Sequence, residues 1–448
     1  MGGLYRILSL GITGFDSPVA LHSLPEAKAA LGSIEAVAEA YTTEFTRIDK
    51  SSYNRLRNLL KDAKKYLDRH NDFDSFNRMH FITRYLNPIC GLMGSTAEQL
   101  GIINNPARKN VILKNSHLFA LNSLRNTYLN DDVLTAEKID LGKKLFFDPL
   151  LSANGKRSCA GCHQPGKGFT DGLQKAMDLD EHSRLARNTP TLWNAALQRN
   201  LFADSRQVSL DYLVTEVLSN EKEMNSGIDA AAQKINRQPG YIDLYYKAYP
   251  NSGDKISGRN MVNAISMYLH TLVSYSSPFD RYMRGETGSM NKNEINGFNI
   301  FMGKARCGTC HFAPLFTGSK PPQYFYQESE VIGVPATADT MHPVLDADDG
   351  RYVHTKKDFH QHAFKTPTLR NIGLTAPYMH NGVYRTLEEV VDFYNKGGGQ
   401  GLGIAPENQT LLPGKLNLTQ TEMKDLVLFL HSLTDTSGIY PGNFVKKP

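Results

Sequence analysis

Two short motifs with the same spacing constrain this chain more than any other feature of its sequence. Both read Cys-x-x-Cys-His and lie in different halves of the chain: Cys159-Ala-Gly-Cys162-His163 and Cys307-Gly-Thr-Cys310-His311. Two thiols at this spacing reach the two vinyl groups of one porphyrin, and the adjacent imidazole then points at the metal. The motifs therefore predict two covalently bound haem c groups, with His163 and His311 as proximal iron ligands.

A zinc site or a redox-active dithiol is the alternative interpretation of a Cys-x-x-Cys pair. Zinc usually needs a second pair or two nearby histidines, whereas here one histidine follows each pair directly. We therefore favour covalent haem at both places. Haem c is normally attached outside the cytoplasm, so we expect a periplasmic or otherwise extracytoplasmic protein. The fifth cysteine, Cys90, is expected to be a small buried apolar residue.

The rest of the sequence favours a mainly α protein built from more than one unit. With 448 residues, the chain is long enough for two or three domains. Residues 1–130 repeat apolar residues every three or four positions and predict an N-terminal helical bundle of unassigned role. Residues 131–285 and 286–448 each begin with a helix, a short loop and one of the motifs. We predict two cytochrome c-like haem domains, duplicates of one helical module, preceded by the bundle.

Capping residues mark the starts of three predicted helices. The capping pairs are Asn291 with Glu294, Thr386 with Glu389, and Thr419 with Glu422. No run of 18 or more apolar residues is present, so no transmembrane helix is expected. The net charge of +5 is small for this length and is not the dense basic patch of a nucleic-acid-binding protein.

With both motifs placed, the chain resembles the bacterial di-haem cytochrome c peroxidase superfamily, which includes MauG-type enzymes. The resemblance covers about residues 130–440 and leaves the preceding residues outside. It rests on the following stretches: LSANGKRSCAGCHQPGKGFTDG, RNTPTLWNA, FADSR followed by NEKEM, CGTCH, and FKTPTLRNIGLTAPYMHNGVYRTLEEVVDFYNKGG.

The resemblance implies different roles for the two haems. The haem of His163 would be the peroxide site, and the haem of His311 would be an electron relay. The family's distal glutamate matches Glu223, which is followed by Met224. A carboxylate above the iron can take a proton from one peroxide oxygen and deliver it to the other. Without the resemblance, Glu223 reads as a solvated acid in the charge-rich stretch NEKEM.

The distal iron ligand of the relay haem distinguishes two kinds of enzyme within this superfamily. Peroxidases fed by electrons carry a methionine fourteen positions after the histidine of a His-x-Gly turn, and MauG-type enzymes carry a tyrosine there. In this chain the turn begins at His380, and the position is Tyr394. A phenolate is a hard, anionic ligand that favours ferric and higher oxidation states. The alternative is that Tyr394 is a packing aromatic, as its neighbour Phe393 would be.

A calcium ion is implied between the haem domains. The matching positions are Asn188 and the carbonyl groups of Thr375 and Pro377, and oxygen ligands of this kind suit calcium. The residues alone leave Asn188, which precedes Thr-Pro, equally open as a turn residue.

The sequence departs from the family where an aromatic residue normally lies between the haems. Ala203 replaces the tryptophan of the Phe-Trp-Asp-Gly-Arg pattern, so Phe202 or Trp193 is a candidate substitute, with Trp193 otherwise a core aromatic. The family's distal glutamine and proline are replaced by Leu213 and Val217, which implies a more apolar distal pocket.

His182 lies in the loop where some members of the family carry a histidine that closes the peroxide haem. We expect His182 to be a solvated loop residue instead, which would leave the iron open.

The leading hypothesis is an extracytoplasmic di-haem peroxidase of MauG-like type. Hydrogen peroxide would react at the haem of His163, and oxidising equivalents would pass through the haem of His311 and Tyr394 to an oxidisable protein. The first alternative is a scavenger of peroxide that receives electrons from a small cytochrome or a cupredoxin. An alternative of another class is a di-haem electron carrier without peroxidase activity.

Overall fold

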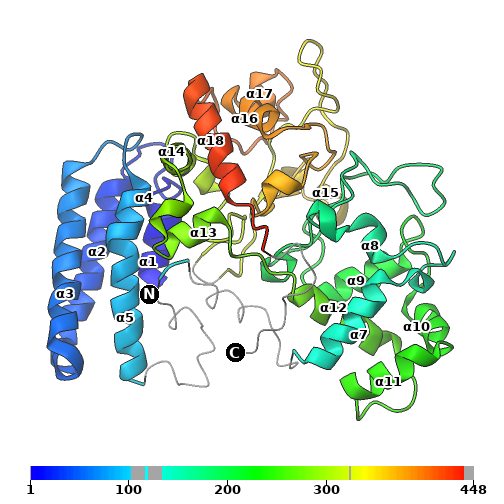
Figure 1. The fold of residues 1–448 in the computed structure, drawn as a ribbon. Helices are drawn as coiled ribbons and strands as arrows, with labels where there is room; N and C mark the ends of the chain where they lie inside the picture. Colours follow the sequence, from blue (N-terminus) through cyan, green and yellow to red (C-terminus); the bar gives the residue numbers. More distant parts are fainter. Residues whose placement is uncertain (1, 102–116, 120–133, 322–323, 438–448) are drawn as a thin grey trace.

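The computed structural model describes residues 2–101, 117–119, 134–321 and 324–437. The chain is mainly helical, as predicted (Figure 1). In the described part of the chain, the only strands are β1 (Ser329–Glu330) and β2 (Phe364–Lys365), which pair antiparallel with Ser329 opposite Lys365. The predicted boundary between residues 130 and 131 lies outside the described residues.

The first hundred residues form a group of helices, and the three longest stand side by side in Figure 1. The elements are α1 (Gly2–Arg6), the π-helix η1 (Ile7–Gly11), α2 (Ser23–Ala40), α3 (Thr42–Arg69), α4 (Arg78–Phe81), the π-helix η2 (Ile82–Leu86) and α5 (Asn87–Gln99). Apolar residues at helical spacing on α3, such as Leu56, Leu60 and Leu67, are buried against the neighbouring helices.

The remainder contains the same helix crossing twice. α7 (Ala136–Phe147) packs on α12 (Gly258–His270), and α14 (Lys292–Met302) packs on α18 (Gln420–Ser432). A glycine lies at each crossing, because a Cβ on Gly142 would overlap with the carbonyl oxygen of Ala264, and one on Gly297 would overlap with that of Asp425. Close backbone approach thus requires glycine at the equivalent place in both modules.

Shorter helices and loops fill each module between its crossing helices. In the first module they are α8 (Cys159–Cys162), α9 (Leu210–Ser219), α10 (Ile228–Asn236) and α11 (Pro239–Ala248). Around and within the second they are α13 (Pro278–Met283), α15 (Tyr352–Thr355), α16 (Leu387–Asn395) and α17 (Gly398–Gly401). Short 3-10 helices complete the chain: Pro149–Leu151, Pro165–Lys167, Ala195–Leu197, Thr287–Ser289, Cys307–Thr309 (η9), Asp358–His360 and Ile372–Leu374.

The predicted helix starts are confirmed. Reciprocal capping boxes begin α14 at Asn291, α16 at Thr386 and α18 at Thr419. Gly397 ends α16 with a positive φ of 100°. Gly398 and Gly399, which follow it in α17, are buried.

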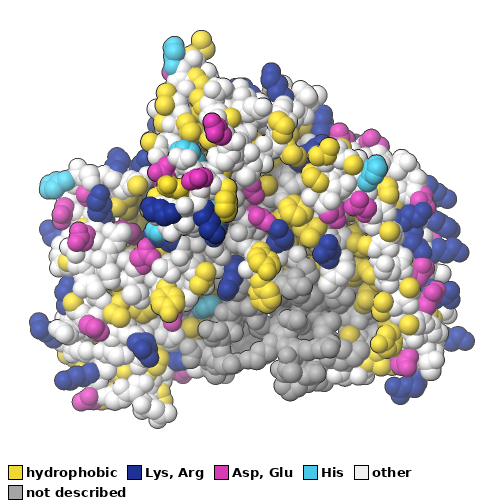
Figure 2. Space-filling view, turned by 180° about the vertical axis from the view of Figure 1, so that it is seen from behind, with side chains coloured by type: hydrophobic (Ala, Val, Ile, Leu, Met, Phe, Trp, Pro, Cys, Tyr) yellow, Lys and Arg dark blue, Asp and Glu magenta, His cyan; other side chains and the backbone are white. Residues whose placement is uncertain are grey.

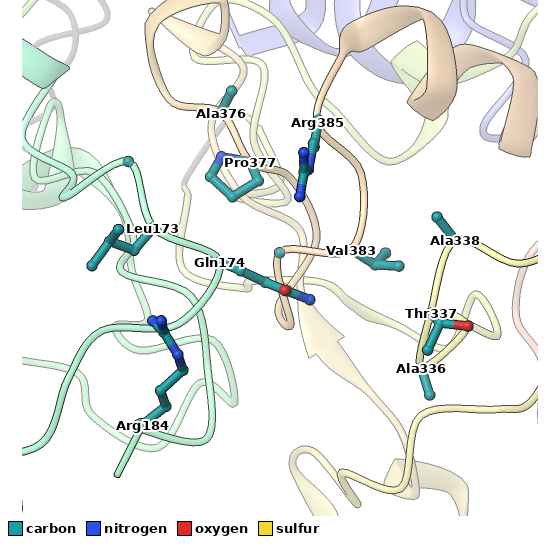
Figure 3. Close-up of a pocket in the computed structure, with 12 residues that line it drawn as sticks. Leu173, Gln174, Arg184, Ala336, Thr337, Ala338, Ala376, Pro377, Val383 and Arg385 are labelled. Atoms are coloured by element: carbon teal, nitrogen blue, oxygen red, sulfur yellow. The ribbon is translucent and has the colours of Figure 1, made fainter. Parts of the chain in front are cut away.

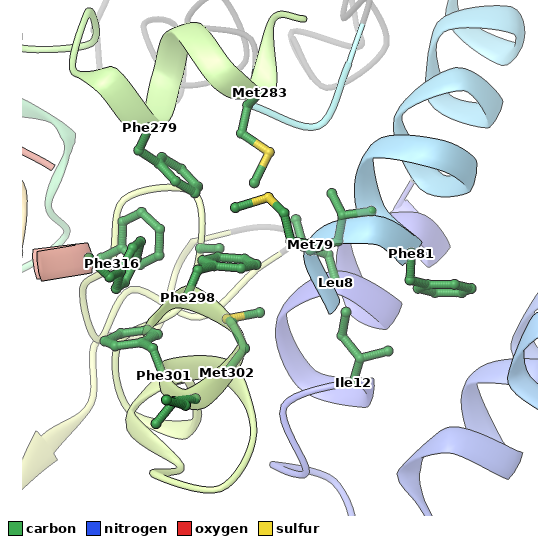
Figure 4. Packing of buried hydrophobic residues seen from close by; sticks show 14 of the residues in the cluster. Leu8, Ile12, Met79, Phe81, Phe279, Met283, Phe298, Phe301, Met302 and Phe316 are labelled. Carbon is green, nitrogen blue, oxygen red and sulfur yellow. The ribbon is translucent and has the colours of Figure 1, made fainter. Parts of the chain in front are cut away.

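The hydrophobic core has two large parts and a small one between the modules. One part belongs to the first module. The other joins the N-terminal helices to the second module, and Figure 4 shows Leu8, Ile12 and Met79 beside Phe298 and Met302. The small part lies between the modules and consists of Leu197, Tyr275, Leu315 and Tyr324. The N-terminal helices are therefore continuous in packing with the second module.

Charged side chains of both signs are interspersed over the face shown in Figure 2. Among the described helices, none combines the length and the hydropathy that a bilayer span requires.

Candidate functional site: two cysteine-histidine motifs and the side chains that face them

The first motif lies on α8, at the end of a loop that follows α7. His163 follows the helix directly, and its Nδ1 lies 3.0 Å from the Phe169 carbonyl oxygen. The Pro190 carbonyl also lies within hydrogen-bonding reach of this imidazole. A proton held on Nδ1 by a carbonyl leaves Nε2 as the basic nitrogen, which is the arrangement of a metal-ligating histidine.

The second motif repeats this geometry. Cys307 begins η9, and Nδ1 of His311 lies 3.2 Å from the Phe316 carbonyl oxygen and 3.1 Å from that of Pro367. Pro190 and Pro367 each stand in the sequence Thr-Pro-Thr-Leu. This second repeat was missed by our sequence reasoning, although both copies were visible, and it supplies the carbonyl groups that orient both imidazoles.

The four motif cysteines are poor candidates for a redox dithiol. Burial raises the pKa of Cys159 and of Cys307 to about 12, and it also raises the pKa of Cys162 and Cys310. A reactive dithiol works through a thiolate and has a lowered pKa. Across the described residues, no group of three or more His, Cys, Asp or Glu side chains is arranged to hold a metal ion. Half-buried cysteines with raised pKa values suit thioether attachment of a porphyrin better than thiolate chemistry.

Trp193 offers an independent test of whether a haem fits at the first motif. The indole is fully buried, and its ring meets that of Phe169 edge-on at 5.1 Å. Its Nε1 has no hydrogen-bond acceptor in the described protein. Because buried donors are almost always paired, the unpaired N–H fits a partner that the polypeptide does not supply, such as a porphyrin carboxylate. This position fits the interpretation of Trp193 as a core aromatic, and its role as a substitute for the aromatic residue between the haems stays a prediction.

Glu223 lies beside the first cysteine pair. Its carboxylate interacts electrostatically with Cys159 and Cys162, and its Oε1 accepts a hydrogen bond of 2.8 Å from Asn220 Nδ2. Burial raises the pKa of Glu223, against the opposing effect of Arg206. A carboxyl group with a raised pKa exchanges protons more readily near neutral pH than an ordinary glutamate does.

Leu213 and Val217, the predicted apolar replacements, lie on α9, and both are partly buried against the core of the first module. His182, in contrast, lies exposed in the loop that ends at the bridge between Met177 and Arg184.

Tyr394 is on α16 and faces the second cysteine pair. Burial raises its pKa, and Cys310, Cys307 and Glu330 raise it further. The neighbouring Phe393 points into the hydrophobic core instead and is 2% exposed. Two adjacent aromatics on one helix therefore have different surroundings: Phe393 belongs to the buried cluster, whereas Tyr394 is half-buried at its edge and interacts electrostatically with the motif cysteines.

Glu330 is a third group at this site, and no sequence pattern indicated it. It lies on β1 and accepts a hydrogen bond of 2.6 Å from Thr410 Oγ1. Burial raises its pKa, and it also interacts with the Cys310 thiol. Its position depends on pairing of β1 with β2, which lie far apart in sequence.

Of the predicted calcium ligands, Pro377 lines a cleft between the modules (Figure 3). The cleft has a volume of about 840 Å³, and Gln174 and Arg184 of the first module also line it. Asn188 donates through Nδ2 to the Leu173 and Gln174 carbonyl oxygens at 2.9 and 3.3 Å. Its backbone N–H also donates to the His380 carbonyl oxygen at 2.7 Å. Asn188 and Pro377 thus approach the same cleft.

Thr375 does not line this cleft but lies near Gly168 of the first module. A Cβ on Gly168 would lie 3.3 Å from Thr375 Cγ2, so this threonine borders the first module. Its hydroxyl donates to Ile372 at 3.3 Å.

Ala203 lies at the junction of the modules. Its carbonyl oxygen accepts a hydrogen bond of 2.7 Å from the Lys365 backbone N–H. The next residue, Asp204, is 1% exposed and forms ion pairs with Arg187 at 2.5 Å and Arg206 at 2.8 Å. Phe202 lies beneath the Arg206 guanidinium at 3.5 Å. At position 203, where the family pattern has a tryptophan between the haems, this chain therefore makes backbone and ion-pair contacts instead.

Comparison with known proteins points to one family. The sequence profile of the di-haem cytochrome c peroxidase family matches residues 136–288. The cytochrome-c peroxidase IdrP2 of Denitromonas iodatirespirans is 34% identical over 313 residues, which cover 67% of this chain and 82% of that protein. The methylamine utilization protein MauG of Methylorubrum extorquens is 34% identical over 300 residues, covering 67% of this chain and 79% of MauG.

Solved structures that resemble this chain include two of the same kind of protein. A MauG-like protein associated with microbial copper homeostasis superposes with a TM-score of 0.61 at 27% identity, covering 71% of this chain and 97% of that one. The diheme peroxidase BthA from Burkholderia thailandensis has a TM-score of 0.53 at 25% identity, covering 69% and 87%.

Proposed function

This chain belongs to the di-haem cytochrome c peroxidase family and is a peroxidase with two haem c groups, and on that premise we propose that it is an extracytoplasmic, MauG-like enzyme. Hydrogen peroxide reacts at the site of His163. Oxidising equivalents pass by way of the site of His311 and Tyr394 to an oxidisable partner protein.

The position of Tyr394 carries this proposal. The phenol lies near enough to the cysteine pair predicted to attach the second haem to interact with it electrostatically, and burial raises the pKa of the phenol. Coordination to iron offers the phenolate a compensating positive charge. A hard anionic ligand stabilises oxidised iron, which suits a site that holds oxidising equivalents.

The chain's own residues supply proton transfer at the first site. A haem iron, when bound, supplies the redox centre at which peroxide is cleaved. The carbonyl groups of Phe169 and Pro190 hold the proton of His163 on Nδ1. Glu223 takes a proton from one peroxide oxygen and delivers it to the other, which leaves as water. The hydrogen bond from Asn220 Nδ2 holds the Glu223 carboxylate in position. Leu213 and Val217 limit the access of water.

A calcium ion at the module junction is part of the proposal. Asn188, with the carbonyl groups of Thr375 and Pro377, would hold it beside the cleft of Figure 3. A cation there would tie the first module to the second.

A scavenger fed by a small cytochrome or a cupredoxin is the second candidate. The relative IdrP2, which is named a cytochrome-c peroxidase, is as similar to this chain as MauG is, at 34% identity.

Potentiometry with an optical readout separates the two candidates. The MauG-like enzyme has a low-potential second haem and stays oxidised in the presence of a small high-potential cytochrome. If the second haem instead takes electrons readily from such a donor and peroxide turnover follows, the scavenger is correct. Two closed low-spin haems that do not react with peroxide would contradict both candidates.

A further inference from the structure

The loops that attach the two haems differ in how far the protein covers them. In the first loop, Ala160 is half-buried and Gly161 is exposed, and a Cβ on Gly161 would meet no heavy atom within 4 Å. The equivalent residues of the second loop are Gly308, which is buried, and Thr309, which is half-buried. A Cβ on Gly308 would lie 3.0 Å from Thr13 Cγ2 and 3.0 Å from Met302 Sδ, so the segment that contributes Thr13 covers this loop together with α14.

Residues 9–18, which we call the cover segment, lie directly on the second attachment loop. Ser9 Oγ donates to the Ala313 carbonyl oxygen at 2.9 Å. The Phe15 ring meets the Phe312 ring edge-on at 5.2 Å. The Pro18 carbonyl oxygen accepts a hydrogen bond of 3.0 Å from Arg306 Nη1. These contacts surround the motif on both sides, since Arg306 precedes Cys307 and Phe312 follows His311.

Arg78 holds the cover segment in place through hydrogen bonds to backbone carbonyl groups. This side chain is fully buried, and its Nε donates to the Ile12 carbonyl oxygen at 2.7 Å. Its other nitrogens donate to the carbonyl oxygens of Phe76 and Phe73 at 3.1 and 2.8 Å. The guanidinium also fills the space beside Gly303, where a Cβ would overlap with it. A buried cation whose donors end on backbone carbonyls fixes the segment rigidly, because moving it would leave those donors unpaired.

Apolar packing adds to this fixation. Leu8 and Ile12 are fully buried in the cluster that also contains Phe301 and Met302 of α14 (Figure 4). The cover segment is thus packed into the core of the second module through Ile12. Nothing comparable lies on Gly161 in the described part of the chain.

We propose that the cover segment closes the second attachment loop to docking by another protein, so that electron exchange with a partner protein does not take place across this loop. The thioether bonds at Cys307 and Cys310 would bring one porphyrin edge to this loop, and the cover segment adds a layer of protein outside it. Small inorganic reagents would still exchange electrons with the second haem. The proposal rests on the relay role given to that haem above.

Hydrogen exchange tests the cover in the unmodified holoprotein. Amides of residues 307–311 are expected to exchange more slowly than those of residues 159–163, because only the former lie beneath the cover segment. Equal rates in the two loops would overturn the proposal without any variant.

Electron exchange tests the consequence. The holoprotein is fully reduced with dithionite, freed of reductant, and mixed without peroxide with ferricyanide or with an oxidised cupredoxin. In Phe15→Ala/Arg306→Ala, which loosens the cover segment, the cupredoxin is expected to reoxidise the second haem about tenfold faster than in the wild type, while ferricyanide acts equally on both. The control Val19→Ala, at a position that is 89% exposed, should match the wild type.

A cupredoxin that reoxidises the second haem equally fast in wild type and loosened variant would overturn the proposal. Because peroxide is absent, this result does not depend on whether the proposed peroxidase mechanism is correct.

Discussion

Glu223 carries the proton-transfer step of the proposed reaction, so its removal should slow that step selectively. Glu223→Gln keeps the shape and the hydrogen bond from Asn220 but removes the proton acceptor. The rate of the reaction with peroxide is expected to fall by about 10² to 10⁴-fold, measured by stopped-flow absorbance. The exposed neighbour Glu221 provides the matched control, and Glu221→Gln should react at the wild-type rate. A wild-type rate in Glu223→Gln would remove it from the mechanism.

The pH dependence of the same step follows from the environment of Glu223. Burial raises its pKa, and the reaction needs the carboxylate form. The rate should therefore fall as the pH is lowered, with a midpoint above the usual range of a glutamate. In Glu223→Gln this limb of the profile should disappear.

At the scale of helices, the glycines of the two crossings are required by close packing. Gly142→Ala would push a methyl group into the carbonyl oxygen of Ala264, so α7 and α12 must separate. We expect a loss of about 1–3 kcal/mol in the free energy of unfolding. Gly32→Ala in α2, where a Cβ meets no atom within 4 Å, should instead stabilise by about 0.5–1 kcal/mol. Thermal unfolding of both variants measures the difference, and equal effects would mean that the crossing tolerates separation.

Helix starts and haem motifs could be predicted from sequence because their determinants are local. The capping boxes at Asn291, Thr386 and Thr419 each involve residues three positions apart. Glu330 could not be predicted, because it reaches Tyr394 and Cys310 only through pairing of short strands that are distant in sequence. The packing of Thr13 on Gly308 is likewise invisible in any local pattern.

At the scale of the whole molecule, the module junction depends on buried ion pairs. Burial alone would raise the pKa of Asp204, but Arg187, Arg206 and His354 outweigh it, and the pKa is lowered. The pKa of Asp348 is lowered in the same way by Arg187. A carboxylate with a depressed pKa in the folded state stabilises above its unfolded pKa and loses this contribution as the pH falls.

Acid should therefore weaken the junction before it unfolds each module. Thermal unfolding between about pH 6 and pH 3 should show a falling midpoint in the wild type. Asp204→Asn should have a lower unfolding midpoint than the wild type at about pH 6. Its midpoint should then fall less than that of the wild type as the pH is lowered to about 3. An identical slope in wild type and variant would show that the ion pairs of Asp204 do not contribute to this loss of stability in acid.

The central claim is that Tyr394 ligates the second haem iron, and low-temperature EPR of the ferric holoprotein tests it most directly. The wild type should show one high-spin haem and one low-spin haem. Tyr394→Phe should lose the low-spin signal, while Tyr384→Phe, the same change at a buried tyrosine of the same cluster, should keep it. An unchanged low-spin signal in Tyr394→Phe would contradict the ligand assignment and with it the MauG-like function.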